Sequence, residues 1–444
     1  MNILLSKIIN IINKILIPFL VKHEMFNLLS LLLILNLKKI KEILPKNKKK
    51  YRAIVLYKSG GIDDLISSQK KYNYNILYLS CPRIFFKYIF FTFLDNHNLH
   101  DLNYNSNKNE IINLKIKYKK FLIRFLKIFK KKYIFKVVIG FNYKYLAERE
   151  LHKACGELKI PFLILLKEGV FTKLQNKYVS YIHRKTNEKS EGYKLAVYSD
   201  YIKKKLIESN ISHKNKVDVI GCSRLNFSHS YKKIAPKNQI VYYAIEKYRG
   251  LPRPFVKHYG RKFFNDLKDH QLYKPRYSWE KLHLKTLKIL KKFAIKNPKT
   301  LIIIKIKTGD KYNKNDYTNL PQNIQINKFG PGHSLLIDSK IVIGWNTTSI
   351  IEGIAANRFI LIPYFYKKNK FFKEVELKLD LKKESYANSE SDFYKKLSFL
   401  NKKYYDKDKI YNNTYSLNYH LGNIDNKAGL RLNKFIKNNL FYKN

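Results

Sequence analysis

KIVIGWNTTSIIEGIAANRFILIPYF, residues 340–365, is the stretch that decides the fold. Its first apolar run, residues 341–343, is short and β-branched and stops at Gly344. A second apolar run covers residues 359–362, and both runs predict buried strands. Residues 346–349 (Asn-Thr-Thr-Ser) are of the kinds that N-cap helices, and the apolar residues after them recur at helical spacing. The stretch therefore predicts a strand, a helix and a second strand.

A unit of this kind is suited to hold a phosphate. In a parallel sheet the connecting helix starts at the carboxyl edge of the strands, where its N–H groups and its dipole favour an anion. We therefore expect the segment that starts the helix to bind a phosphorylated ligand.

Further short apolar runs alternate with stretches long enough for helices, which predicts parallel sheets. We expect an α/β fold of two Rossmann-like domains that face each other across a cleft, with an N-terminal helical extension. The expected strands are residues 53–57, 76–79, 135–139, 162–166, 195–198 and 217–220 in the first domain, and 240–244, 301–305, 341–343 and 359–362 in the second.

A chain of 444 residues is too long for one ordinary core, so two domains are the default expectation. We expect residues 51–227 to form the first domain and residues 238–400 the second, with a polar, Pro-containing hinge between them. Residues 1–50 are expected to be an apolar and basic helical extension with its linker. Residues 401–444 are expected to be a tail, helical and crossing back.

The charge of +55 points to nucleic acid, an anionic membrane or an acidic substrate. The chain is also crowded with Lys, Asn, Ile, Tyr and Phe, residues that AT-rich codons specify, so codon bias is an alternative source of the basicity. We expect no specific nucleic-acid partner. Cys81, Cys155 and Cys222 are widely separated, which predicts a reducing cytoplasm and no metal site.

Two segments raise the question of a membrane. Lysines interrupt the apolar N-terminus, so we expect no spanning helix but two short helices, either packed on the protein or lying on the inner membrane face. Residues 114–132 have aromatic residues at helical spacing among many lysines. This helix either docks on anionic lipid through its Lys and aromatic residues or is an ordinary surface helix.

Several motifs together resemble the GT-B glycosyltransferases of surface carbohydrate and capsular polysaccharide biosynthesis. This superfamily includes UDP-N-acetylglucosamine 2-epimerases, Kdo transferases and CDP-glycerol transferases. The resemblance covers most of residues 51–370, and its most specific part is HSLLIDSKIVIGWNTTSIIEGIAANRFILIPYF at 333–365. The other matching pieces are YKSGGIDDL at 57–65, LLKEG at 165–169, VYSDYIKKKL at 197–206, VIGCSR at 219–224 and IIIKIKTGD at 302–310.

The resemblance implies a donor site in the second domain. Asn346, Thr347 and Thr348 would contact the donor phosphates, and Glu352 would hold the ribose of the nucleotide. The alternative for Glu352 is a capping box with Ser349, in which it binds no ligand.

Four further residues of the second domain are candidates for the same ligand. Lys305 and Lys307 close a predicted strand and could neutralise the phosphates, or they are solvent-facing lysines. His333 and Ser334 could close over the base or the diphosphate, although a lone histidine is more often structural.

The first domain should supply a base for the acceptor hydroxyl. The candidates are Glu168, which follows a buried strand, and Asp63 and Asp64, which follow the Gly60-Gly61 turn. Gly60 and Gly61 form either a ligand loop or a plain tight turn. Lys167 could keep Glu168 ionised or contact phosphate, or Lys167-Glu168 is only an exposed ion pair. Asp63 and Asp64 could equally serve only to favour the start of their helix.

These inferences predict a cytoplasmic GT-B transferase that uses neither a metal nor a cofactor. It would move a sugar or polyol phosphate from a nucleotide-activated donor to a surface glycan or lipid-linked acceptor, at the inner membrane surface. The alternatives are a nucleotide-sugar epimerase of the same fold and a non-catalytic basic scaffold that binds membrane or nucleic acid.

Overall fold

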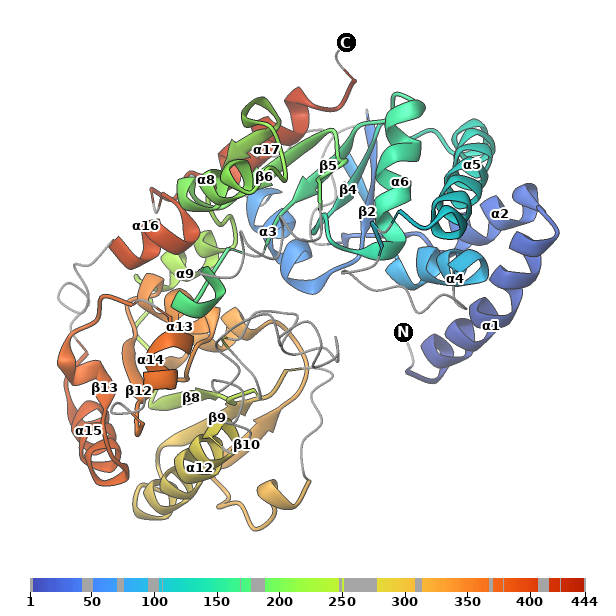
Figure 1. Ribbon diagram of the computed structural model, residues 1–444. Helices are drawn as coiled ribbons and strands as arrows, with labels where there is room; N and C mark the ends of the chain where they lie inside the picture. Colours follow the sequence, from blue (N-terminus) through green and yellow to red (C-terminus); the bar gives the residue numbers. More distant parts are fainter. Residues whose placement is uncertain are drawn as a thin grey trace. The chain divides into compact units, whose positions relative to one another are not determined.

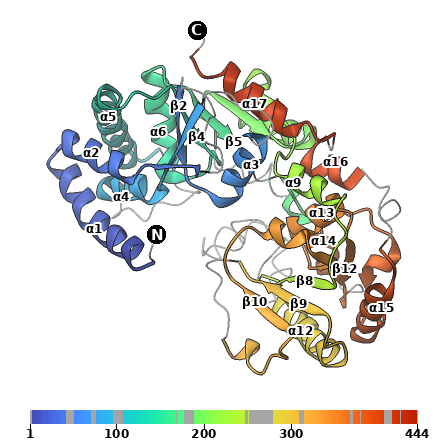
Figure 2. The ribbon, with the colours of Figure 1, turned by 180° about the vertical axis from the view of Figure 1, so that it is seen from behind.

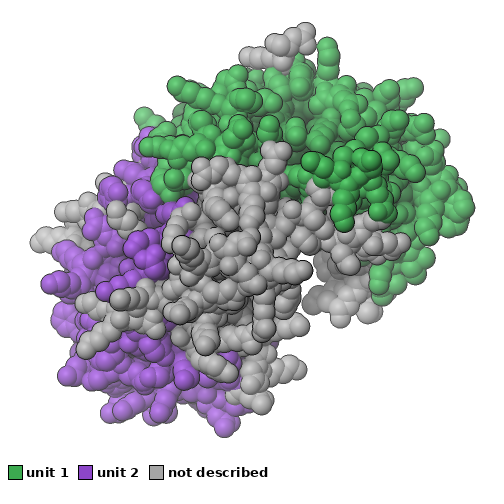
Figure 3. Space-filling model, in the orientation of Figure 1, with its two compact units in different colours: residues 1–169, 180–224, 427–444 green, residues 170–179, 225–426 purple. Residues whose placement is uncertain are grey.

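The chain forms two compact units, which are coloured separately in Figure 3. Unit 1 comprises residues 1–169, 180–224 and 427–444, and unit 2 comprises residues 170–179 and 225–426. The computed structural model describes residues 3–41, 51–69, 76–94, 104–105, 107–167, 169–176, 188–246, 250, 278–307, 314–366, 370–377, 379–405, 415–423 and 425–442.

The sheet of unit 1 has the strand order β1-β3-β2-β4-β5-β6-β7 (Figure 1). Only the edge pair of β1 and β3 is antiparallel, and the other neighbours are parallel. Counted from β2, the six parallel strands follow the order 2-1-3-4-5-6, which is the other common doubly wound order, 2-1-3-4-5, with one more strand. The strands are β1 (Lys38–Lys39), β2 (Tyr51–Leu56), β3 (Ile76–Cys81), β4 (Val137–Gly140), β5 (Phe162–Leu165), β6 (Lys194–Val197) and β7 (Val217–Val219).

Helices cover both faces of this sheet, which is why its central strands are apolar along their whole length. On one face, α3 (Ser59–Gln69) and α17 (Ala428–Asn438) contribute Leu65, Leu432 and Ile436 to the core. On the other face lie α4 (Arg83–Leu94), α5 (Asn109–Lys132) and α6 (Leu146–Glu157). Unit 1 also contains α8 (Asp200–Glu208) and the 3₁₀ helix η3 (Lys214–Lys216).

The C-terminal helix α17 belongs to unit 1 although unit 2 precedes it in the chain. The Asn433 side chain donates to the Ser68 carbonyl (2.8 Å), and Arg431 Nε donates to the Ile220 carbonyl (2.9 Å). These bonds attach α17 to α3 and to the loop after β7.

The two N-terminal helices, α1 (Ile3–Lys22) and α2 (Phe26–Asn36), form an outer layer on α4 and α5 (Figure 2). One side of α1 is buried through Ile17, Leu20 and Val21. The amide of Asn13 donates to Asn36 Oδ1 (3.0 Å) in the buried contact between the two helices. In the part of the chain that the structure describes, no helix is both long and apolar enough to cross a membrane.

The aromatic side of α5 is buried, which corrects one of the two interpretations of residues 114–132. Phe121, Phe125 and Phe129 are at most 3% exposed, because they pack in the layer between α5 and its neighbours. The Phe121 ring contacts Phe26 of α2, with the centroids 5.0 Å apart. Docking on lipid through the aromatic residues of this helix is therefore wrong.

The sheet of unit 2 has the strand order β10-β9-β8-β11-β12-β13, and all five pairs are parallel. Counted from β8, the strands follow the order 3-2-1-4-5-6 of the Rossmann fold. The strands are β8 (Gln239–Tyr243), β9 (Leu301–Lys305), β10 (Ile324–Asn327), β11 (Ser339–Ile343), β12 (Phe359–Pro363) and β13 (Tyr386–Ala387).

The helices of unit 2 include the one expected from residues 346–355. Among the described residues they include α9 (Leu225–Tyr231), α12 (Ser278–Lys296), α13 (Thr348–Ala355), α14 (Lys370–Val375), α15 (Glu390–Lys402) and α16 (Tyr415–Leu421), with the 3₁₀ helices η5 (Lys314–Tyr317), η6 (Gly332–Leu336) and η7 (Lys383–Ser385). The expected α/β class with two Rossmann-like sheets is confirmed, and each expected strand overlaps an observed one.

Candidate functional site

The start of α13 lies at the topological switch point of the unit 2 sheet. Strand β11 pairs with β8 on one side and with β12 on the other, and the connections leave β8 and β11 in opposite directions along the sheet. Ligands of open α/β sheets bind outside the carboxyl ends of the strands at this kind of point. The residues after Ile343 therefore occupy the position where a ligand is expected.

The helix begins at Thr348, and its N-cap is Thr347, whose hydroxyl accepts from the Ser349 N–H (3.3 Å). A capping box would need Ser349 at the N-cap, so that interpretation of Glu352 is wrong. Asn346 has a φ of 50°, a left-handed conformation that asparagine tolerates better than most residues. The first turn of α13 contains no acidic residue that would repel an anion.

The side chain of Asn346 is engaged at both ends. Its Nδ2 donates to the Val375 carbonyl, and its Oδ1 accepts from the Leu377 N–H (2.8 Å). These bonds hold the end of α14 and Leu377, two residues beyond it, against the turn before α13. The Asn346 amide thus shapes the turn, while Thr347 and Thr348 present hydroxyls at the helix start.

Glu352 lies one turn into α13 and is only 5% exposed. Its charge acts on two tyrosines, Tyr231 at the end of α9 and Tyr243 at the end of β8. Burial raises the pKa of both phenols, and the Glu352 carboxylate raises them further. The carboxylate is therefore near Tyr243, at the carboxyl end of β8, and Tyr231, at the end of α9.

The predicted residues His333 and Ser334 lie in η6, beside α13. A side chain at Gly332 would place its Cβ 3.8 Å from Ser349 Oγ, which shows how closely η6 approaches the first turn. The Tyr243 hydroxyl donates to the Gly332 carbonyl (2.8 Å). The buried His333 ring stacks almost flat on Phe227, 4.8 Å between centroids at 4°.

The two lysines of the predicted donor site have different positions. Lys305 Nζ donates to Asn327 Oδ1 (2.8 Å) and to the carbonyls of Phe329 (2.7 Å) and Gly330 (2.9 Å). All three ammonium hydrogens are thus directed at the loop that leads into η6. Lys307 is 58% exposed and pairs with Glu246 (3.1 Å).

Arg358 is a structural residue that the sequence did not suggest, and it lies just before β12, at the amino edge of the sheet. It is fully buried, and its guanidinium donates to the carbonyls of Tyr231 (3.1 Å) and Ile337 (3.1 Å) and to the Tyr405 hydroxyl (2.6 Å). It therefore fixes the end of α9 and the end of η6 against each other. An isolated arginine between a helix and a strand carries no pattern from which this role could be recognised.

Unit 1 gathers its predicted residues at the carboxyl edge of its own sheet. A Cβ at Gly60 would lie 3.7 Å from Lys167 Nζ and 4.0 Å from an Arg224 guanidinium nitrogen. Gly61 has a packing role, because a Cβ there would come within 2.1 Å of Cδ1 of Phe141. Both glycines lie in the first turn of α3, so the expectation of a separate tight turn before the helix is wrong. The close approach of Phe141 requires a glycine at position 61, and two positively charged side chains lie beside Gly60.

Asp64 is the centre of a buried network. Its carboxylate accepts from the Tyr198 hydroxyl (2.5 Å), the Arg224 N–H (2.9 Å) and the Arg224 guanidinium (3.2 Å). The same guanidinium donates to the Tyr198 hydroxyl (2.7 Å). Asp64 thus ties α3 to the ends of β6 and β7. Asp63 is half-buried, and Glu168 lies outside the described residues.

Glu148 is a second residue that the sequence analysis missed. It is 2% exposed on α6, and its Oε1 pairs with Arg83 Nε. Its Oε2 has no hydrogen-bond partner and lies beside Gly140, the last residue of β4. Burial raises the pKa of Glu148 to about 7, although Arg83, Lys87 and Lys58 act in the opposite direction. The only signal in the sequence was the run Glu148-Arg149-Glu150 within a helix between two buried strands.

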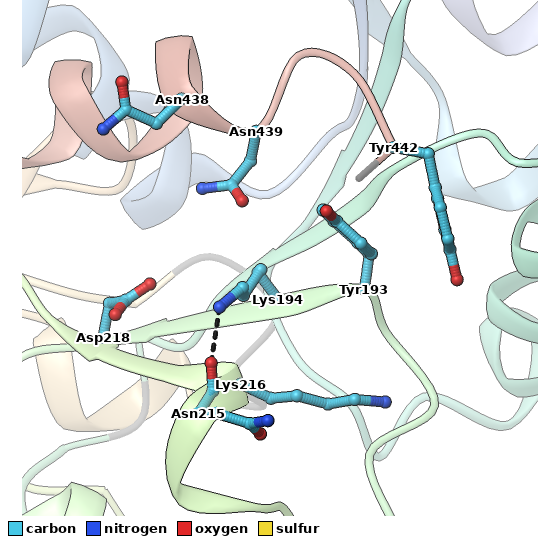
Figure 4. Close-up of a pocket in the computed structure, with 8 residues that line it drawn as sticks. All are labelled: Tyr193, Lys194, Asn215, Lys216, Asp218, Asn438, Asn439 and Tyr442. Atoms are coloured by element: carbon cyan, nitrogen blue, oxygen red, sulfur yellow. Dashed lines mark hydrogen bonds between the residues drawn. The ribbon is translucent and has the colours of Figure 1, made fainter. Parts of the chain in front are cut away.

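A hollow of about 670 Å³ lies at the other edge of unit 1, at the amino ends of β6 and β7 (Figure 4). The rings of Tyr193 and Tyr442 lie 4.4 Å apart beside it. The lining residues are Tyr193, Lys194, Asn215, Lys216, Asp218, Asn438, Asn439 and Tyr442. This edge is opposite to the one where sheets of this order bind ligands, and the hollow contains none of the predicted site residues. No group of His, Cys, Asp and Glu side chains within the described ranges could hold a metal ion.

Comparison with known proteins gives structural similarity alone. No family model and no curated protein matches the chain. The solved structure of the wall teichoic acid polymerase TagF is 11% identical, with 98% of each chain covered and a TM-score of 0.47. The UDP-GlcNAc 2-epimerase of Neisseria meningitidis, bound to UDP-GlcNAc, is 11% identical, with 87% of this chain and 100% of that one covered and a TM-score of 0.43. The calicheamicin glycosyltransferase CalG4 is 10% identical, with 88% and 98% covered and a TM-score of 0.42. These are the kinds of protein that the sequence motifs resemble, and since one fold serves many functions, the activity must be argued from the site.

Proposed function

We propose that this protein is a glycosyltransferase that moves a sugar or polyol phosphate from a nucleotide-activated donor to a surface glycan or lipid-linked acceptor. The observation that supports it best is the start of α13 at the switch point of the unit 2 sheet. There the positive end of the helix dipole and the hydroxyls of Thr347 and Thr348 suit a phosphate group.

Different elements of unit 2 contact different parts of the donor in this proposal. The start of α13 receives the phosphates, and Glu352, one turn further on, accepts from the ribose hydroxyls. The loop of η6 carries His333 beside this helix, where its imidazole can contact the base or the diphosphate. In this proposal Lys305 acts indirectly, since its three hydrogen bonds hold that loop in place. Lys307, which is exposed, is the lysine that suits a phosphate.

The base that activates the acceptor hydroxyl belongs to unit 1 in this proposal. Glu168 and Asp63 remain our candidates. Asp64 is less suited, because its oxygens already accept three hydrogen bonds. Glu148 joins them, because a carboxyl group whose pKa is about 7 is divided between its two protonation states at neutral pH.

The test is product analysis with a panel of UDP-, CDP- and CMP-activated donors. We expect nucleotide release to depend on an added glycan or lipid-linked acceptor. Conversion of the sugar in the absence of an acceptor would instead identify a nucleotide-sugar epimerase. If a folded preparation carries out neither reaction with any of the donors, the remaining alternative is a non-catalytic scaffold.

A further inference from the structure

The two N-terminal helices expose an unusual amount of apolar side chain. Seven large hydrophobic residues on α1 and α2 are each about half exposed or more, whereas such residues are normally scattered singly on a protein surface. They are Ile11 (60%), Ile12 (48%), Ile15 (70%), Phe19 (52%), Leu28 (47%), Leu31 (50%) and Leu35 (73%). We call these seven residues the outer face.

The outer face lies opposite the sides by which the helices pack. On α1 the buried residues are Ile17, Leu20 and Val21, which fall on the other side of the helix from Ile15. On α2 the buried residues Leu29 and Leu33 are likewise opposite Leu31 and Leu35. Since α1 packs on α4 and α2 packs on α5, both exposed sides point away from unit 1.

The contacts beneath the outer face are specific, so the exposure belongs to the folded state. The buried Asn13 and Asn36 side chains are hydrogen-bonded to each other (3.0 Å). At the turn between the helices, Glu24 pairs with Arg124 of α5 (3.2 Å). The hairpin is thereby held in one orientation with its apolar residues outward.

Positive charges border this face. Lys14 and Lys22 are exposed on α1. On α5, Lys117, Lys120 and Lys127 recur with Arg124 at intervals of three and four residues, which places them along one side of the helix. The Arg124–Glu24 pair brings this basic side of α5 to the turn of the hairpin.

We propose that the outer face docks on the surface of an anionic lipid bilayer, with α1 and α2 lying in the plane of the interface. The apolar side chains would enter the boundary between headgroups and acyl chains, and the basic residues would contact anionic headgroups. A second copy of this chain fits the same surface less well, because a symmetric contact would bring the two sets of lysines together.

The inference rests on the proposed function in one respect: a lipid-linked acceptor would be reached from this surface. Membrane binding itself requires no activity and is measured separately. Of the two segments that the sequence offered for a membrane contact, it selects the N-terminal helices, because the aromatic side of α5 is buried.

The experiment is co-sedimentation of the full chain with vesicles of phosphatidylcholine, alone or with about a quarter phosphatidylglycerol. The test variant is Ile15→Glu with Leu35→Glu. The matched control is Ile295→Glu with Phe399→Glu, which changes two residues that are 71% and 59% exposed in unit 2. Circular dichroism and nucleotide titration show whether each variant keeps its fold and its donor site.

We expect the natural chain and the control to bind the anionic vesicles, and the test variant to bind them at least about 10-fold more weakly with nucleotide binding unchanged. Equal binding by the test variant, or no binding by the natural chain, would overturn the proposal. So would a dimer that the test variant dissociates while vesicle binding persists.

Discussion

At the scale of single residues, some side chains near the predicted sites are hydrogen-bonded within the protein, and others are available to a ligand. Asn346, Lys305 and Asp64 all stand where the sequence suggested a ligand contact, and each has its polar atoms engaged by the protein. Buried polar atoms need such partners, because an unsatisfied one costs about 1 to 3 kcal/mol. Asn346 and Lys305 hold the segments beside the start of α13, and Asp64 holds α3 to the ends of β6 and β7 in unit 1.

Asp64 is the clearest case for a residue-scale test. Replacing it by Asn leaves the Arg224 guanidinium buried without its counter-ion, so we expect a loss of about 3 kcal/mol in the free energy of unfolding, measured in urea. Asp63→Asn, on the same helix and only half-buried, is the control and should stay within about 0.5 kcal/mol. An Asp64→Asn variant that keeps its stability but loses turnover would mean that Asp64 is the base.

The raised pKa of Glu148 predicts how the stability of the folded chain changes with pH. Its pKa is raised from 4.5 to about 7 on folding, so between these values the folded chain holds a proton that the unfolded chain has lost. The contribution of Glu148 to stability therefore falls as pH rises through this window, by about 3 kcal/mol at most, and is constant above it. The difference in unfolding free energy between the natural chain and Glu148→Gln should fall accordingly from about pH 5 to pH 8. A pH-independent difference would refute the shift.

At the scale of helices and strands, the sequence was a good guide wherever local pattern decides structure. Short β-branched runs predicted the strands, and the Asn-Thr-Thr-Ser cluster predicted the start of α13 within two residues. Contacts between residues distant in the sequence could not be predicted. Asp64 is hydrogen-bonded to Tyr198 and Arg224, which are 134 and 160 positions away, and Arg358 to Tyr231, which is 127 positions away. The amphipathic pattern correctly predicted the helix α5. Such a pattern shows that one face of a helix is apolar, but it does not show whether protein or lipid covers that face.

Gly61, in the first turn of α3, gives an element-scale prediction with an internal control. Gly61→Ala places a Cβ about 2 Å from the Phe141 ring, so we expect a loss of about 1 to 3 kcal/mol from overpacking. Gly156→Ala, inside α6, meets nothing within 4 Å and should be neutral or stabilise by up to about 1 kcal/mol. Equal thermal midpoints for the two variants would show that α3 does not pack as closely on Phe141 as described.

At the scale of the whole molecule, three histidines with lowered pKa values predict sensitivity to acid. Burial lowers the pKa of His152 to about 3 and those of His229 and His283 to about 4, from an ordinary value of 6.5. Between these values the unfolded chain binds more protons, so stability is complete above about pH 6.5 and is lost as pH falls through the window.

His283 offers a direct check of this acid sensitivity. Its two ring nitrogens are hydrogen-bonded to the hydroxyls of Tyr242 (2.7 Å) and Tyr317 (2.9 Å). Protonation of the ring would therefore either break one of these hydrogen bonds or leave a charged imidazolium buried away from water. We expect His283→Gln to lower stability at neutral pH but to flatten its decline below about pH 6. His213→Gln, at an exposed position, should leave the decline unchanged. Identical pH profiles for both variants and the natural chain would contradict this account.

The central claim is that the start of α13 and Glu352 form the site for a nucleotide-activated donor, and calorimetric titration with UDP, CDP and CMP tests it most directly. Because Glu352 is expected to accept charge-assisted hydrogen bonds from ribose, we predict saturable binding of one nucleotide and at least about 10-fold weaker binding by Glu352→Ala. The exposed Glu384→Ala variant is the control and should bind like the natural chain. Unchanged affinity in a folded Glu352→Ala variant, or no saturable binding of any nucleotide by the natural chain, would contradict the claim.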